Sequence, residues 1–180
     1  MIPATGAALG SAASTLQPLL SIASATTLVE LVGRCARVLS TFDAMGAHLL
    51  VLWRADGSTL DLVYARGLSA TSEHAAEAAA LSGHAGEVAR SGQAAWVDHP
   101  AAEGAGQRVE LWLPVKVEGK TYGAFGVFAA DAAVVSAHQD ALTTIAELIA
   151  LACERIAGGI PARFARPVLA TDSPAEAGRA

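Results

Sequence analysis

Two consecutive segments, residues 108–117 (RVELWLPVKV) and 120–129 (KTYGAFGVFA), constrain the fold of this 180-residue chain most strongly. Both are rich in the aromatic and β-branched residues that favour strands, and the Glu118-Gly119 pair between them predicts a tight turn. Together they predict a long β-ribbon that must be covered on both sides.

The two faces of the first strand differ in character, because successive side chains of a strand point to opposite sides of the sheet. One face carries Glu110 and Trp112. The other face is aliphatic and is expected to lie against helices; it consists of Val109, Leu111, Leu113 and Val115. Pro114 cannot donate a ladder hydrogen bond, so the strand is predicted to lie at an edge or to be irregular there.

The spacing of apolar residues predicts the other elements. In chain order they are a helix at 14–22, a helix from a Thr27/Glu30 capping box to about Phe42, strands at 47–54 and 59–65, helical segments at 69–81 and 83–91, a strand at 93–97, and a last helix that begins at Ser136 and ends near Ile156. We expect a flexible segment at 1–13, one domain at 14–158 and a disordered tail at 159–180.

Composition narrows the class of protein. Hydrophobic residues make up 53% and charged residues 16%, which is too apolar for a disordered chain. A net charge of −5 argues against nucleic-acid binding. Two cysteines cannot form a disulfide framework, and Gly, Ser and Pro interrupt the uncharged first 29 residues, so we expect no membrane span and a cytoplasmic location.

The order of these elements is that of an α+β fold, and two stretches sharpen the comparison. Residues 83–98 (GHAGEVARSGQAAWVD) and 111–128 (LWLPVKVEGKTYGAFGVF) resemble the signature segments of the GAF-domain family. The resemblance implies a central antiparallel sheet of five to six strands. It places the N- and C-terminal helices on one face, and a roof of helices and the 98–107 loop on the other. It also implies a sensory or regulatory role.

One branch of that family reduces free methionine sulfoxide, a reaction that needs accessible thiolates. The branch keeps cysteines in the pocket and in the loop before the Glu-bearing strand. Here Glu110 matches that glutamate, but the 98–107 loop has no cysteine. Cys35 and Cys153 instead lie on apolar stripes of the terminal helices. We therefore expect a non-enzymatic protein with no catalytic residue.

Other cofactors find little support in the residues. His84 and His99 flank the predicted roof and are the only histidines suited by position to haem or a metal. No His-Glu-x-x-His, Cys-x-x-Cys or phosphate-binding glycine loop occurs, and the Asn-Lys-x-Phe-Asp-Glu motif of cyclic-nucleotide-binding relatives is absent. We expect no cofactor and no metal.

Six residues in, beside or beneath the predicted roof define the candidate pocket. They are Trp96, Asp98, His99, Glu110, Trp112 and Arg90. Trp112 and Trp96 either stack on a flat or cationic small molecule or fill the core and close the pocket. The second alternative describes a scaffold that binds a partner protein rather than a small molecule.

The last helix carries more apolar surface than one packing stripe requires. It is either wedged deep inside its own domain or pairs with the first helix in a homodimer built as a four-helix bundle. The dimer candidates are Leu31, Leu39, Leu148 and Leu151. The chain carries no output domain in its sequence, so we expect a separate signalling protein as its partner.

Overall fold

The computed structural model describes residues 17–42, 45–54, 57–67, 83–99, 108–156 and 168–169. A short helical stretch at 17–23 comes first. The elements that follow are α2 (Leu28–Leu39), β1 (Ala47–Trp53), β2 (Leu60–Arg66), α4 (His84–Ser91), β3 (Ala95–His99), β4 (Arg108–Val117), β5 (Lys120–Ala129), α5 (Ala132–Arg155) and β6 (Val168–Leu169). The predicted lead-in at 1–13 and helix at 69–81 lie outside the described residues.

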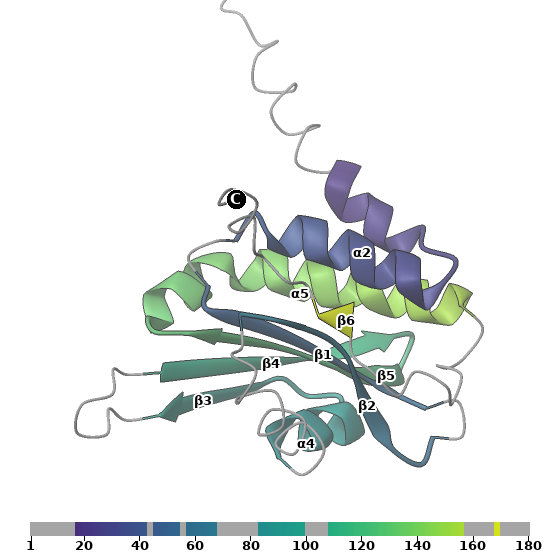
Figure 1. Cartoon of the computed structure of the whole chain (residues 1–180). Coiled ribbons are helices and arrows are strands. Elements are labelled where there is room, and N and C mark those ends of the chain that lie inside the picture. Colours follow the sequence, from purple (N-terminus) through teal and green to yellow (C-terminus); the bar gives the residue numbers. More distant parts are fainter. Residues whose placement is uncertain are drawn as a thin grey trace, which may run out of the picture.

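The strands form one sheet in the order β3-β4-β5-β1-β2-β6. Neighbours are antiparallel except for β6, which pairs with β2 in parallel through Val168 and Leu169. Helices α2 and α5 cover one face of the sheet, and α4 lies against the other (Figure 1). These are called the helix face and the α4 face below. The predicted α+β class, with its central antiparallel sheet, is confirmed.

The β4–β5 hairpin has the predicted bounds. Its pairing runs from Val109 opposite Ala129 to Val117 opposite Lys120. The turn needs two positive φ angles, 49° at Glu118 and 82° at Gly119. Glycine adopts this conformation without steric cost, which is why a Gly-containing pair joins the strands here.

Side-chain alternation along this hairpin separates two apolar cores. Leu111 and Leu113 enter the larger core, under α2 and α5. Trp112, which lies between them in the sequence, enters a smaller core on the α4 face. The prediction that the aliphatic side of β4 lies against the terminal helices, with Trp112 opposite, is confirmed.

Pro114 sits where β4 has lost one neighbour. The pairing of β3 with β4 ends at Ala95 opposite Trp112, whereas β5 continues along β4 past Pro114. Among the described residues, β5 is therefore the only strand beside Pro114. A residue without an N–H donor is tolerated at such a local edge, as predicted.

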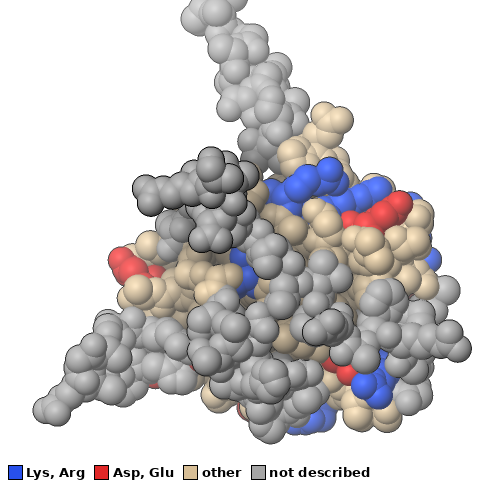
Figure 2. All heavy atoms as spheres, in the orientation of Figure 1, with Lys and Arg blue, Asp and Glu red and all other residues tan. Residues whose placement is uncertain are grey.

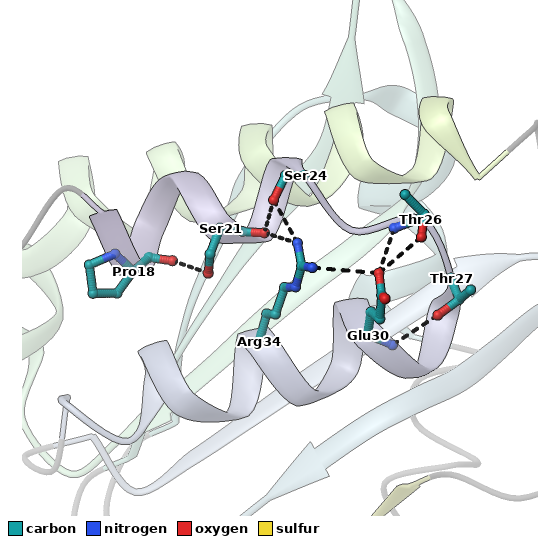
Figure 3. Close-up of polar contacts among 7 residues, drawn as sticks. All are labelled: Pro18, Ser21, Ser24, Thr26, Thr27, Glu30 and Arg34. Carbon is teal, nitrogen blue, oxygen red and sulfur yellow. Dashed lines mark hydrogen bonds and ion pairs between the residues drawn. The ribbon is translucent and has the colours of Figure 1, made fainter.

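The N-terminal stretch is held to α2 by polar contacts around Arg34 (Figure 3). The Arg34 guanidinium donates to the Ser21 carbonyl oxygen and to Ser24 Oγ, each at 2.6 Å. Thr27 caps α2 by accepting from the Glu30 amide at 3.2 Å. The Glu30 carboxylate accepts from the Thr26 amide at 2.9 Å instead of from the Thr27 amide. This half of the predicted capping box is therefore shifted by one residue. Apolar packing completes the attachment, because Ile22 is fully buried.

Several predicted bounds differ from the observed ones, including those of β3, which is predicted at 93–97 and lies at Ala95–His99. Helix α5 begins at Ala132, where Asp131 caps it by accepting from the Ala133 amide at 2.8 Å, so Ser136 lies inside the helix. The earlier start adds a turn that buries Val135. Helix α2 ends at Leu39, short of Phe42. Val168–Leu169 form β6, so the expected tail without regular structure does not hold at these two residues.

Among the described helices, none combines the length and the apolar character that a membrane span requires.

His48 is a polar side chain buried within the sheet, at 2% exposure. Its ring stacks on Phe125 with centroids 6.3 Å apart and an interplanar angle of 4°. Neither ring nitrogen has a hydrogen-bond partner. Burial, with a smaller effect of the Arg66 charge, lowers the pKa of His48 to about 4.

This burial predicts a loss of stability in acid. The unfolded chain takes up the His48 proton near pH 6.5 and the folded chain only near pH 4, so stability falls as pH drops through that window. Between pH 7 and pH 4.5 the contribution of His48 is about 2–3 kcal/mol. Urea unfolding of wild type and His48→Leu at both pH values measures it. Equal pH dependence in the two proteins would contradict the assignment.

Candidate functional site

The candidate site lies on the α4 face, where β4 and β5 meet α4. We define it by Glu110, Trp112, Gly126 and Phe128. Helix α4 supplies small and medium side chains to the same core, namely Ala85, Val88 and Ala89, while β1 supplies Leu49 and Val51. The site is thus built on two central strands and one short helix rather than on loops.

Trp112 fills the floor of this site. Its side chain is 3% exposed and lies over Gly126, directly opposite it on β5. A Cβ at position 126 would fall 2.5 Å from the Trp112 ring, which is closer than any real side chain allows. Phe128 meets the indole edge-on, with centroids 5.5 Å apart and an angle of 85°. The absence of a side chain at Gly126 therefore leaves the space that the Trp112 indole occupies.

The Glu110 carboxylate is tied to the same indole. Trp112 Nε1 donates to Glu110 Oε2 at 3.1 Å. Glu110 and Trp112 are two residues apart on β4, so both side chains point to the α4 face. This places one carboxylate at the border of an apolar core, half-buried and oriented by the buried ring.

Helix α4 packs on the same core, and its C-terminal end meets β4. Gly92 ends the helix with φ at 65°, and Val88 O accepts from its amide. Lys116 packs against Gly92 at the C-terminal end of α4, where a cation is favoured by the helix dipole. Arg90, a predicted pocket residue, is exposed on α4 with its guanidinium over Gly86.

Trp96 and Asp98 do not join this site, contrary to the expected pocket. Trp96 lies opposite Leu111 and Asp98 opposite Val109. Directly opposed residues share a face, so both belong to the helix face and cannot stack on one ligand with Trp112. Trp96 Nε1 donates instead to Asp98 Oδ1 at 3.1 Å. His99 ends β3 opposite Arg108, and His84 is exposed at the first position of α4.

Both thiols lie on the far side of the sheet from Trp112. Cys35 on α2 and Cys153 on α5 are buried in the helix-face core. Burial raises the pKa of Cys153 to about 12, and burial together with the neighbouring Cys153 raises the pKa of Cys35 further. At neutral pH both are protonated, as expected of structural cysteines. In the part of the chain that the structure describes, no cluster of His, Cys, Asp or Glu could hold a metal ion.

Two of the four dimer candidates are wrong. Leu31 and Leu39 are fully buried within their own chain, so they have no surface to offer a partner. Leu151 is 42% exposed and Leu148 is half-buried. The alternative that α5 is wedged within its own domain holds for one side of the helix; Leu148 packs at the edge of that core, and Leu151 is exposed.

The family follows from sequence and fold together. A GAF-domain model matches residues 25–154, which include the whole of the smaller core and most of the larger one. The chain belongs to the GAF-domain family. No curated protein matches this sequence.

Solved structures share this fold at low sequence identity. The GAF domain of an Acinetobacter phosphoenolpyruvate-protein phosphotransferase is 16% identical, covers 83% of this chain and 98% of its own, and has a TM-score of 0.55. Residues 122 to 287 of a methyl-accepting chemotaxis protein are 16% identical, with 79% and 98% covered and a TM-score of 0.58. Free methionine-R-sulfoxide reductase from Neisseria meningitidis is 16% identical, with 87% and 95% covered and a TM-score of 0.55.

The contact between Gly126 and Trp112 makes a direct prediction. Gly126→Ala places a methyl group within the indole, so we expect a loss of about 1–3 kcal/mol in unfolding free energy and a shifted tryptophan emission. Gly33→Ala on α2 is the matched control, because a Cβ there meets nothing within 4 Å. Urea unfolding followed by fluorescence measures both. In a Trp112→Leu background the Gly126→Ala cost should shrink; an unchanged cost would show that the indole is not its source.

Proposed function

We propose that this GAF domain is a non-enzymatic sensory or regulatory module that receives a small molecule at the α4 face. The signal passes through β4 to the terminal helices and from there to a separate output protein in the cytoplasm. Among the structural neighbours, the GAF domain of a potassium sensor histidine kinase and a segment of a methyl-accepting chemotaxis protein have this fold. We do not propose binding to nucleic acid or to a membrane.

One observation carries the proposal. Trp112 packs under α4, while its neighbours Leu111 and Leu113 pack under α2 and α5. Protein interiors are close-packed, so a displaced indole cannot leave the backbone and the opposite face unchanged. Consecutive residues of one strand thus couple the two layers without a long chain of contacts.

The ligand would take its place beside Trp112 by shifting the indole away from Gly126. A flat molecule suits this position because it can stack where the indole lies now. Moving Trp112 also releases the hydrogen bond to Glu110, which can then accept from the ligand. The response is a population shift, and it requires the ligand to bind the two states with different affinity.

The terminal helices would report the shift through a homodimer. We propose that Leu148 and Leu151 of each chain meet those of a second chain. The Arg34 contacts hold the N-terminal stretch on α2, so a change in α2 is carried to residues 17–23. A reductase activity is not proposed, because both thiols are buried and lie away from the α4 face.

A closed scaffold is the second candidate, and the burial of Trp112 favours it. The Trp112 indole is 3% exposed and α4 packs directly on the sheet, so side chains of the domain itself already fill the α4 face. In that case the domain would act only as a surface for its partner protein.

Native mass spectrometry of the full chain purified from its source tests the proposal. We expect a dimer with a retained small molecule that is released on denaturation, and stronger retention in Trp112→Phe, because the smaller ring costs less to displace. Gly33→Ala serves as the control and should retain it fully. A bare dimer in every preparation would favour the scaffold.

A turnover assay with free methionine sulfoxide tests the absence of enzymatic activity. We expect no turnover above buffer in wild type, with the Neisseria meningitidis reductase as positive control. Turnover that is lost in Cys35→Ser or Cys153→Ser would contradict the assignment of both thiols to the core.

A further inference from the structure

Strand β3 (Ala95–His99) ends the sheet on the side opposite β6. Within the described residues it pairs with β4 alone, and no described strand lies beyond it (Figure 1). The outer backbone N–H and C=O groups of such an edge strand are available for pairing with another chain. This edge is separate from the α4-face site and from the exposed leucines of α5.

Edge strands usually carry features that prevent pairing, such as lysine, proline or a bulge. The β3 sequence AWVDH contains neither lysine nor proline. Its register with β4 is regular over all five pairs, from Ala95 to His99. Trp96 is also exposed by 38%, which is unusual for the largest apolar side chain.

We propose that β3 pairs with β3 of a second copy of this chain, antiparallel, about a two-fold axis through Val97. This register is self-complementary, because it sets Trp96 of each copy opposite Asp98 of the other. The pairing would join two sheets into one continuous sheet. The inference goes beyond the proposed function and does not depend on it.

The side chains fit this register chemically. Within one strand, the Trp96 indole already donates to Asp98 at 3.1 Å. Residues directly opposite in an antiparallel pair have Cβ atoms about 4.5–5.5 Å apart, closer than residues i and i+2 of one strand, about 7 Å apart. The same donor and acceptor can therefore meet across the interface with less strain.

Charge does not oppose the pairing. The two Asp98 carboxylates would be diagonal neighbours, at about 7–8 Å, and each would lie nearer to an indole than to the other carboxylate. At the axis, Val97 would meet Val97 on the α4 face, where two half-buried aliphatic side chains gain contact. Two large charged residues in place of the valines at the axis would prevent this contact between the copies.

Two variants that differ only in charge test the register. Trp96→Asp sets carboxylate against carboxylate across the axis, whereas Trp96→Lys sets an ammonium opposite Asp98. Both remove the exposed indole, so the loss of apolar surface is matched. Both are made in a Leu151→Asp background, which removes association through α5 and leaves β3 as the contact measured.

Sedimentation equilibrium over a concentration series gives the dissociation constants. We expect the Leu151→Asp protein to dimerise, Trp96→Lys to preserve the dimer, and Trp96→Asp to raise the dissociation constant at least about tenfold, or 1.4 kcal/mol. A monomeric Leu151→Asp protein at about 1 mM, or equal association of the two Trp96 variants, would overturn the proposal.

Hydrogen exchange keeps the test decisive if a variant fails to fold. In the Leu151→Asp protein, alternate amides of residues 95–99 point outward and should gain protection as concentration rises. Amides of α4 should not change. Protection of β3 that is independent of concentration would overturn the pairing.

Discussion

The structure depends on the alternation of side chains along β4. Leu111 and Leu113 enter one core and Trp112 the other, so a single strand forms a wall of both. Because the period of a strand is two, a shift of one residue would place the indole under α5 and two leucines under α4. Neither layer could then pack, since the space over Gly126 fits an indole and the helix-face core is packed around the leucines at 111 and 113. The register of the β4–β5 hairpin therefore sets the position of every helix.

This hairpin was also the part most completely predictable from sequence. Its two strands are long and apolar, and the Glu118-Gly119 turn fixes their register locally. Local sequence does not determine the start of α5, because Asp131 and Ser136 are both good capping residues. The burial of Val135 in the core favours the earlier start at Ala132. This burial is a tertiary effect that the local sequence does not show.

The candidate site could be predicted only in part. Glu110 and Trp112 follow from alternation within one strand, and the structure places both on the α4 face. The face of Trp96 depends on how β3 registers with β4, and no local signal in a five-residue strand fixes that. Gly126 is not among the predicted pocket residues, although a glycine in a strand interior often marks a close approach of another side chain. Similarly, an apolar stripe places Leu31 and Leu151 on helices. It does not show that Leu31 is buried in the core of its own chain whereas Leu151 is exposed.

Burial of Trp112 also determines what kind of ligand the α4 face could accept. Removing a buried indole from its core exposes about 150–250 Å² of apolar surface, which costs roughly 4–6 kcal/mol. A ligand that merely touched the edge of the site would have to offset this from its own contacts, and its affinity would fall by three or more orders of magnitude. A flat ligand that occupies the vacated space over Gly126 restores most of the lost contact. The glycine that lets Trp112 close the site thus also defines the shape of a molecule able to open it.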